Sequence, residues 1–498
     1  MFSEEDSSQD NSSFAEPAVG IVYGDVGTTS LNISVLSKLQ KLEYVQIEHE
    51  EIGWVIGHVS DIQRKTDLSL DKARMIGQGA EIDIHEKTTA KIEIIGYRDE
   101  RGLLQVPRTP FRAGQYVYHA DDETIKRTLG IKEYTKTGAY IGLLYGHNIR
   151  VELDINSLVQ KHVSILAKTG GGKSFLCGDL LEELMKHNVT VLVLDPHGEY
   201  ASMKEEGRIL ESTRDFQVEP KGYADKIIEF ATDPQSNPDA LPLRFTLSNI
   251  EANDLLSLTN IKNSKVHLSY LKKAIEALRN SKQDYSLKDI INVLKREEDL
   301  NNYALICELQ YLDDAQIFAS SGTKISELVK TGMTTIVNLK GTPPELAELI
   351  VNRICTALFE LRKIGAVPPM MLVVEEAHNF CPQQGTVASS KIFRTIAAEG
   401  RKFGLGLTII SQRAAKIDKN VLSQCNTQII LKITNPNDLK AIVGSVEGLT
   451  ASMADEIQRL PIGVAMCVGS GIQMPLIVEV RPRESKHGGE SVMVISDI

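Results

Sequence analysis

The sequence predicts an α/β protein: a parallel sheet domain, preceded by a small β-barrel and interrupted by a helical subdomain. From about residue 140, continuous apolar runs alternate with helical stretches, as in a parallel sheet that helices cover on both faces. Before it, residues 19 to about 120 contain short apolar runs separated by glycines and charged turns, a spacing typical of a small barrel. Residues 250 to 330 are rich in helix formers.

The barrel region shows short apolar runs that alternate with polar residues. We expect strands at Gly20–Tyr23, Leu31–Leu36, Trp54–Val59 and Thr89–Ile95. No catalytic constellation appears among these residues. The region is therefore interpreted as a binding or assembly module.

The sheet domain is predicted from continuous apolar strands. These are expected at Val163–Leu166, Val189–Leu194, Thr334–Leu339, Met371–Val374, Leu407–Ile410 and Gln428–Leu431. The segment Ser174–His187 has apolar residues at helical spacing, so a helix follows the first of these strands. In the inserted region, Ser286 and Asp289 form a capping box before a helix.

These patterns divide the chain into six segments. The boundaries are a disordered acidic tail at 1–18, the barrel at 19–140, the first part of the sheet domain at 141–249, the helical subdomain at 250–330, the remainder of the sheet domain at 331–479 and an extended tail outside the core at 480–498.

The composition restricts the class of protein. The net charge is −11, so contact with DNA or RNA must come from a local basic patch, for example inside a ring or channel. The chain has no apolar run of roughly 18 residues and no signal peptide at its start, so we expect a cytoplasmic protein with no membrane span. The six cysteines include no C-x-x-C pair, which favours reduced, buried thiols.

The segment Ala167-Lys-Thr-Gly-Gly-Gly-Lys-Ser174 is typical of a phosphate-binding loop between a strand and a helix. Backbone N–H groups in such a loop surround phosphate oxygens, and the following helix adds its positive end. Lys173 is expected to reach the β- and γ-phosphates, and Ser174 to supply a hydroxyl to Mg²⁺. Ala167 replaces the usual first glycine, which is tolerable if its φ is negative. The expected nucleotide contacts are Thr169, Gly170, Gly171, Gly172, Lys173, Ser174 and Phe175.

Two glutamates end an apolar strand in Met371-Leu-Val-Val-Glu-Glu-Ala-His378. In phosphoryl transfer, one carboxylate orients the ligands of the metal and another polarises the attacking water. We assign Glu375 to Mg²⁺ and Glu376 to the water. Asp195 ends a strand that we expect beside the loop strand, so it remains an alternative acid for either role.

The segment Glu399–Arg413 supplies a third motif. Its apolar strand ends in Ser411-Gln412, where Gln412 is placed to sense the γ-phosphate. Arg401 stands before that strand. A guanidinium stabilises the charge that develops on phosphoryl oxygens, and an exposed Arg401 would reach the nucleotide of a neighbouring subunit in a ring. Without further information, an arginine at a solvated helix end is an equal alternative.

Taken in order, AKTGGGKS, LDPHGEY, LVVEEAHNF and EGRKFGLGLTIISQR resemble the HerA family of DNA-translocating ATPases, in the HerA–FtsK branch of RecA-like motors. The loop motif alone occurs in many nucleotide hydrolases, whereas the ordered set is much more specific. The resemblance covers nearly the whole chain, and the amino-terminal region is similar to the family's HAS-barrel. Ala167 is the departure, because the family's loop usually has glycine there.

The resemblance implies an archaeal RecA-like ATPase that uses ATP and Mg²⁺ and forms a homohexameric ring with ATP at the subunit interfaces. It implies that double-stranded DNA threads through the pore, and that the protein acts as a helicase or translocase in end resection and double-strand-break repair with a NurA-family nuclease. The nucleotide, metal, acidic and sensor roles fall on the residues named above. Arg401 is then the best candidate for an arginine finger.

A ring around duplex DNA needs basic side chains that contact phosphates without reading sequence. The segment Arg413–Lys419 follows the sensor strand, and loops after parallel strands lie at the carboxyl edge of the sheet. We predict Lys416 and Lys419 as DNA contacts. A solvated basic turn is the alternative interpretation of these two lysines.

Two other functions are compatible with the motifs. One is a related motor of conjugation or secretion, against which the absence of an apolar span counts. The other is a nucleotide-dependent clamp that recruits a nuclease without moving along DNA, against which the paired acids and Arg401 count. An ABC-type ATPase is excluded because the chain has no LSGGQ-like signature.

Overall fold

The computed structural model describes residues 17–489, apart from 209–210, 212–213, 234–236, 248–249, 260, 262–264, 282–284, 297–301, 315–316, 320, 447–448 and 470. The described chain forms two compact units, one within residues 1–132 and 145–149 and the other within residues 133–144 and 150–498. The expected acidic tail at 1–18 lies almost wholly outside the described residues.

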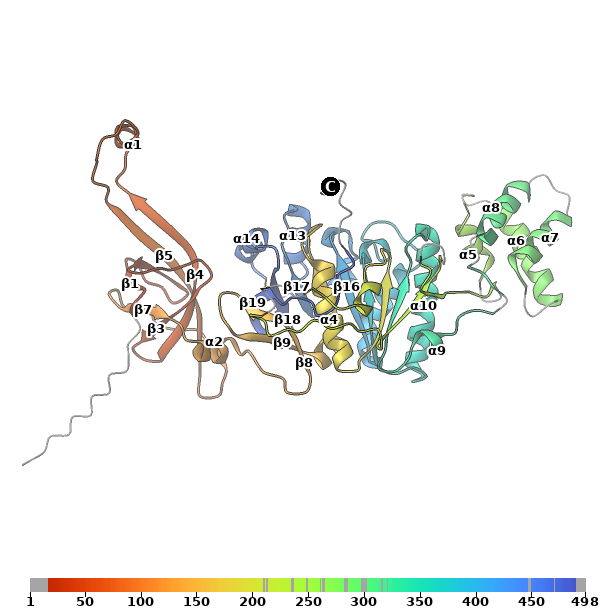
Figure 1. The fold of residues 1–498 in the computed structure, drawn as a ribbon, viewed down its shortest axis with the longest axis horizontal. Coiled ribbons are helices and arrows are strands. Elements are labelled where there is room, and N and C mark those ends of the chain that lie inside the picture. The colour runs from red at the N-terminus through yellow and green to blue at the C-terminus, as the bar shows by residue number, and fades with distance from the viewer. Residues whose placement is uncertain are drawn as a thin grey trace, which may run out of the picture. The chain divides into compact units, whose positions relative to one another are not determined.

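The first unit is a closed antiparallel β-barrel (Figure 1). Among its described residues, six strands pair in the order β2-β1-β7-β3-β4-β5, and β5 pairs back to β2. Apolar side chains such as Ile33, Ile47 and Val55 fill its interior. The strands are β1 (Gly20–Tyr23), β2 (Ser30–Val35), β3 (Tyr44–His49), β4 (Gly53–Thr66), β5 (Glu86–Arg98) and β7 (Tyr116–His119), with the short β6 (Leu104–Gln105) pairing to β5 and a helix α2 (Asp122–Leu129) after β7.

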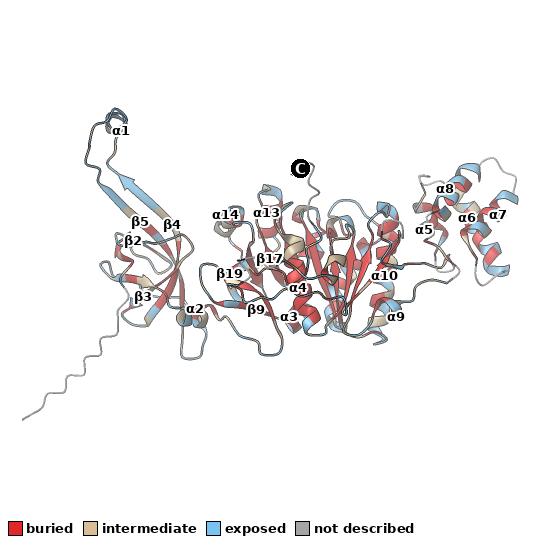
Figure 2. Ribbon diagram, in the orientation of Figure 1, coloured by how far each residue is buried: buried red, intermediate tan, exposed pale blue. Residues whose placement is uncertain are grey.

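Two of the barrel strands extend into an exposed arm. The far ends of β4 and β5, joined through the short helix α1 (Leu70–Gly77), are solvent-exposed (Figure 2). No residue of α1 is buried. The alternation of apolar and polar residues located β4 and β5, but it did not indicate their length.

The second unit is built on one large mixed sheet (Figure 1). Its described residues form twelve strands in the order β13-β12-β14-β11-β15-β16-β10-β17-β18-β19-β8-β9. The strands from β13 to β17 pair in parallel, and those from β17 to β9 pair antiparallel. The parallel strands are β10 (Val163–Leu166), β11 (Thr190–Asp195), β12 (Ile227–Ala231), β13 (Leu241–Pro242), β14 (Thr334–Asn338), β15 (Met370–Val374), β16 (Leu405–Ser411) and β17 (Thr427–Ile430), and the antiparallel extension consists of β18 (Val464–Gly469), β19 (Ile472–Val480), β8 (Gly138–Leu144) and β9 (Arg150–Asp154).

The parallel part confirms the predicted fold class, a RecA-like sheet domain that carries a phosphate loop. The strand order corrects one expectation, because β11 is not beside the loop strand β10. It pairs with β14 and β15, and both β15 and β16 stand between it and β10. Every residue of β10, β11, β14, β15, β16 and β17 is buried (Figure 2), whereas the edge strand β13 is exposed.

Helices follow or precede the parallel strands. The helix after β10 is α4, and its apolar residues recur at helical spacing, as the sequence predicts. The helices of this part are α3 (Ile155–Lys161), α4 (Lys173–Lys186), α9 (Ile325–Leu328), α10 (Pro344–Lys363), α11 (Ser390–Glu399), α12 (Lys419–Leu422), α13 (Pro436–Val443) and α14 (Ala451–Arg459). Among the described residues, no helix is both long and apolar enough to cross a membrane.

The inserted helices have a hydrophobic core of their own. Leucines and isoleucines of α5 (Ala252–Ser257), α6 (Lys265–Ser281), α7 (Leu287–Arg296) and α8 (Tyr303–Asp314) pack together. The predicted capping box is present: the Ser286 N–H donates to Asp289 at 2.9 Å, and the Asp289 N–H donates to the Ser286 hydroxyl at 3.3 Å. Cys307 in α8 is exposed, unlike the other cysteines, so the expectation of buried thiols fails at this position.

The segment after β19 corrects the expectation of a tail outside the core. Residues 481–489 have no regular secondary structure, yet Arg481, Arg483, Glu484 and Ser485 are buried. Hydropathy does not predict that charged residues lie in a core. Here their burial is explained by charged partners on α4. Residues 490–498 lie outside the described residues.

Candidate functional site

The glycine-rich loop connects β10 to α4 and has the backbone that glycine permits. Gly170 and Gly172 have φ of 69° and 92°, in the left-handed region, and Gly172 caps the N-terminus of α4. A Cβ atom on Gly171 would lie 2.9 Å from the Lys168 carbonyl oxygen. The N–H groups of the first turn of α4 have no partner within the helix, so this loop and helix end form a concavity suited to an anion.

Ala167 occupies the first position of the loop without backbone strain. It is buried, its φ is not positive, and its N–H donates to the Ser411 carbonyl at 3.3 Å. The condition on which alanine is tolerable is therefore met. Its methyl group lies 3.1 Å from the place where a Cβ on Gly171 would be, so it packs inside the turn.

The Lys173 amine contacts both glutamates at the end of β15. It forms an ion pair with Glu375 and lies 3.0 Å from Oε1 of Glu376. Glu375 is fully buried, and the Tyr200 hydroxyl donates to its other oxygen at 2.6 Å. Burial lowers the pKa of Lys173, but the two carboxylates outweigh it and hold that pKa above its ordinary value. Burial raises the pKa of Glu375, with Lys173 opposing the shift.

Glu376 is held in an unusual conformation. Its φ and ψ are 49° and 45°, a left-handed backbone that is uncommon outside glycine and is often kept at functional sites. Its Oε2 lies 3.2 Å from Nδ1 of His378, which in turn lies 2.9 Å from the Ser411 hydroxyl. Burial raises the pKa of Glu376, but His378 and Lys173 outweigh it and lower the pKa to about 2. The carboxylate is therefore ionised at neutral pH.

Gln412 follows β16 and lies against the phosphate loop. The Thr169 hydroxyl in the loop donates a hydrogen bond to the Gln412 side-chain oxygen. The structure thus brings Gln412 to the loop, as the sensor prediction requires. A ligand bound in the loop would compete with Gln412 for the Thr169 hydroxyl. Binding would therefore change the hydrogen bonding of Gln412 at the end of β16.

Asp195 does not face the loop as an available acid. Its buried carboxylate accepts three backbone N–H groups of its own turn, from His197 at 3.2 Å, Gly198 at 2.9 Å and Tyr200 at 3.1 Å. Burial raises its pKa to about 7, although these hydrogen bonds oppose the shift. The arrangement favours a positioning role for Asp195, because its turn places Tyr200 against Glu375.

Arg401 lies at the opposite end of the sheet from the loop. It belongs to the 3-10 turn η6 (Gly400–Phe403), which precedes β16, and it is exposed. A Cβ on the neighbouring Gly400 would lie 3.5 Å from the ring of His162, the residue before β10. Because β10 and β16 are parallel, the loop lies beyond the other ends of these strands. The structure does not bring Arg401 together with the loop of its own chain.

Lys416 and Lys419 lie after the carboxyl end of β16 and are both exposed. The Lys419 N–H donates to the Gln383 side chain at 2.7 Å, and the Lys416 carbonyl accepts from the Gln383 N–H at 2.7 Å. Their backbone is therefore fixed while their amines remain exposed. Their contact with DNA stays a prediction.

The donor set at the loop fits Mg²⁺. Hard cations of this kind take oxygen ligands, and Ser174 offers a hydroxyl while Glu375 and Glu376 offer carboxylates. Both oxygens of Glu375 are engaged by Lys173 and Tyr200. A cation beside Glu375 therefore requires the Lys173 amine to move, and phosphate oxygens are the partner toward which it would move.

The motifs contain two site residues that were not singled out. Tyr200 ends LDPHGEY and His378 lies in EEAHNF, and each contacts one of the paired glutamates. Their positions within these motifs were the sequence signal that could have identified them as site residues. The contact of Tyr200 with Glu375 depends on strand order, which no local pattern specifies, whereas His378 is two residues from Glu376.

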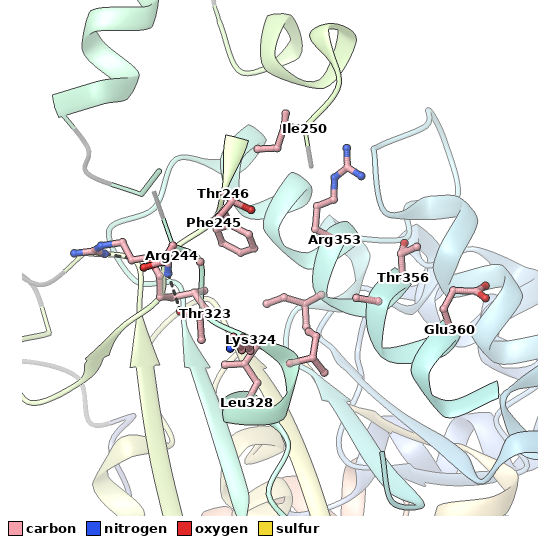
Figure 3. Close-up of a pocket in the computed structure, with 16 residues that line it drawn as sticks. Arg244, Phe245, Thr246, Ile250, Thr323, Lys324, Leu328, Arg353, Thr356 and Glu360 are labelled. Carbon is pink, nitrogen blue, oxygen red and sulfur yellow. Dashed lines mark hydrogen bonds between the residues drawn. The ribbon is translucent and has the colours of Figure 1, made fainter. Parts of the chain in front are cut away.

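A separate cavity of about 610 Å³ lies away from the loop, beyond the edge strand β13 (Figure 3). Apolar side chains such as Phe245 and Leu328 line it, with Arg353 and Glu360 of α10 on one side. None of the loop residues contributes to it. It is therefore not part of the candidate site.

Comparisons with known proteins agree with this geometry. A family model described as "Helicase HerA, central domain" matches residues 139–358, which include the loop. The chain is 28% identical to the DNA double-strand break repair helicase HerA of Pyrococcus furiosus, covering 96% of each chain. It is 29% identical to the probable DNA double-strand break repair helicase HerA of Methanocaldococcus jannaschii, covering 96% of this chain and 98% of the relative.

The chain is therefore similar to the HerA helicases over nearly its whole length. The paired glutamates and Arg401 lie beyond the residues that the family model matches. A solved structure of VirB4 from Thermoanaerobacter pseudethanolicus resembles the fold, with a TM-score of 0.50 and 15% identity over 70% of this chain and 97% of that one. This likeness concerns the fold alone.

Proposed function

We propose that this chain is a member of the HerA family and an ATP-driven motor, a helicase or translocase that acts on double-stranded DNA in end resection and double-strand-break repair. The main support for the proposal is the contact of the Lys173 amine, at the end of the glycine loop, with the carboxylates of Glu375 and Glu376. The DNA substrate and the repair process are inferred from the names of the HerA relatives. The active form is a homohexameric ring that works with a partner nuclease of the NurA family.

In the proposed reaction Lys173 leaves the carboxylates and binds the β- and γ-phosphates of ATP. Glu376, ionised and released from Lys173, orients the attacking water. Ser174 and Glu375 would hold Mg²⁺, which would neutralise charge on the phosphates. Gln412 reports occupancy of the loop through Thr169.

The position of Arg401 supports the proposed ring. Exposed and remote from its own loop, this arginine serves the nucleotide of the adjacent subunit, where a guanidinium stabilises the phosphoryl transition state. Lys416 and Lys419 contact DNA phosphates in the pore. In this arrangement, the acidic residues that give the net charge of −11 lie mainly on surfaces that do not contact DNA.

ATP hydrolysis measured with and without duplex DNA tests the proposal. Wild type should be stimulated by DNA, and Lys173→Ala should lose both nucleotide binding and hydrolysis. Glu376→Gln should keep nucleotide binding and lose hydrolysis by about 10²- to 10⁴-fold, because a positioned carboxylate acts mainly on the chemical step.

Glu360→Gln, at an exposed glutamate of α10, is the matched control and should hydrolyse ATP as wild type does. Negligible hydrolysis by wild type in the presence of DNA and the nuclease would overturn the motor assignment and leave a clamp that recruits a nuclease.

A further inference from the structure

His162 is a buried histidine at the amino edge of the sheet. It lies between α3 and β10, at the end of β10 opposite to the phosphate loop. Its φ and ψ are 55° and 149°, a backbone conformation that residues other than glycine rarely adopt. Strained backbone of this kind persists only where the surrounding structure holds it, often at functional positions. Contacts with neighbouring elements must therefore hold His162 in place.

The imidazole ring of His162 joins two elements that flank Arg401. Its Nδ1 accepts the Leu407 N–H of β16 at 2.9 Å. A ring nitrogen that accepts carries no proton, so the proton is on Nε2, which donates to the Ala397 carbonyl of α11 at 3.2 Å. Burial, together with the positive charge of Arg401, lowers the pKa of His162 to about 4 although the Ala397 carbonyl opposes the shift. The ring is therefore neutral at physiological pH and keeps both hydrogen bonds.

These two hydrogen bonds hold both sides of the segment that carries Arg401. Ala397 precedes the turn η6, in which Arg401 lies, and Leu407 follows it. The end of the turn is also fixed from α10, because Nε of Arg362 donates to the Phe403 carbonyl at 2.7 Å. The hydrogen bond from His162 to Ala397 fixes the other side, at the end of α11.

The position of the Arg401 guanidinium depends on this backbone. The side chain is exposed and forms no ion pair with the described residues of its own chain. No carboxylate orients it, so the course of the turn determines what it can reach. A displacement of about 1 Å in a catalytic arrangement can cost roughly 100-fold in rate. The contacts that hold the turn therefore matter for any catalytic function of Arg401.

We propose that His162 is a positioning residue, which holds Arg401 where it reaches the nucleotide of the adjacent subunit. The inference rests on the proposed trans role of Arg401 and adds the residue that places it. His162 is also joined to the strands beside its own loop, because its carbonyl accepts the Thr427 N–H of β17 at 3.2 Å and the next residue begins β10. A defect at Arg401 and a defect in the loop are separable, since the first acts on the neighbouring subunit and the second on the same chain.

Steady-state ATP hydrolysis by His162 variants gives the first test. His162→Leu removes both hydrogen bonds of the ring and should lower kcat about 10- to 100-fold, with KM for ATP within about threefold, because its own loop is unchanged. His162→Gln keeps a donor near the position of Nε2 and should keep kcat within about fivefold of wild type, the scale of one lost hydrogen bond. If His162→Leu does not fold, His162→Asn takes its place with the same expected loss, since it keeps an acceptor near Nδ1 but does not reach Ala397.

His49→Leu is the matched control, because His49 is a buried histidine of the barrel with the same kind of contacts. Its Nδ1 accepts the Glu51 N–H at 3.2 Å, and its Nε2 lies 3.1 Å from the Thr109 carbonyl oxygen. This substitution should leave kcat unchanged. Equal losses of kcat in the two leucine variants, or no loss in His162→Leu, would overturn the inference.

Mixed rings, verified by native mass spectrometry, show in which subunit the His162 defect acts. His162→Leu should regain part of its activity when mixed with Lys173→Ala, which supplies a well-placed Arg401, and none when mixed with Arg401→Ala. Recovery with Arg401→Ala, or no recovery with Lys173→Ala, would overturn the inference and leave the role of Arg401 intact. If Arg401→Ala and Lys173→Ala do not complement each other, the trans role and the inference fail together. The ATPase proposal fails separately, if wild type hydrolyses no ATP.

Discussion

Ala167 replaces the usual first glycine of the loop without backbone strain. The position shapes the turn, and alanine meets its backbone requirement because φ is not positive. The proposed phosphate contacts come from other groups, the glycine N–H groups and Lys173. What the position contributes is a buried methyl group beside Gly171.

Ala167→Gly should therefore leave ATP hydrolysis within about threefold of wild type, since the change alters backbone entropy and no phosphate contact. The same entropy term should lower stability by roughly 0.5–1 kcal/mol. Steady-state hydrolysis and thermal unfolding measure the two effects. A large gain or loss of turnover would mean that the methyl group places the loop for catalysis.

The glycine loop and the paired glutamates could be located from the sequence, and some of their partners could not. Local patterns identify both motifs, and the ends of the strands bring Lys173 to both acids. The expected place of Asp195 beside the loop strand is wrong, because it depends on strand order, and its catalytic role stays a prediction. In the sheet, β11 is two strands removed from β10, and three N–H groups occupy the Asp195 carboxylate.

At the scale of elements, hydrophobic pattern located six parallel strands of the sheet and helix α4. It missed the parallel strands β12 and β13, the antiparallel extension of the sheet, the barrel strands β3 and β7, and the burial of the C-terminal segment. The C-terminal segment has too many charges for a hydropathy argument to place it in a core. Arg481 is fully buried because it lies 2.9 Å from Glu182 and 3.0 Å from Glu183, both on α4. A local sequence pattern cannot indicate that acidic residues on a helix far away in the sequence will pair with the arginines of this segment.

Arg481→Ala should destabilise the second unit by about 3–5 kcal/mol, because it removes the fully buried cation that pairs with the buried carboxylates of Asp179, Glu182 and Glu183. Chemical denaturation followed by circular dichroism measures the change. Lys486→Ala, at an exposed residue of the same segment, is the control and should shift stability by less than about 1 kcal/mol. Equal effects of the two substitutions would show that the buried cluster does not hold the segment.

At the scale of the whole molecule, the proposed site takes residues from two chains. The loop, the acids and Gln412 meet at the carboxyl edge of the sheet, while Arg401 lies exposed at the amino edge. A closed ring of identical subunits uses one surface of each chain against a different surface of the next, so it can bring the two edges together. This geometry makes Arg401 either a trans-acting group or a surface arginine without catalytic effect.

Mixing two inactive variants decides between these roles. Arg401→Ala and Lys173→Ala should each hydrolyse ATP poorly alone, the first by about 10³- to 10⁵-fold if it removes a finger. In an equal random mixture, about a quarter of interfaces in a ring join an intact loop to an intact Arg401, so part of the activity should return. Native mass spectrometry verifies that mixed hexamers form. A mixture of Lys402→Ala with Lys173→Ala is the control, because Lys402 is the exposed neighbour and its loss should leave activity intact before mixing. Mixed hexamers with no recovered hydrolysis would remove Arg401 from the catalytic site.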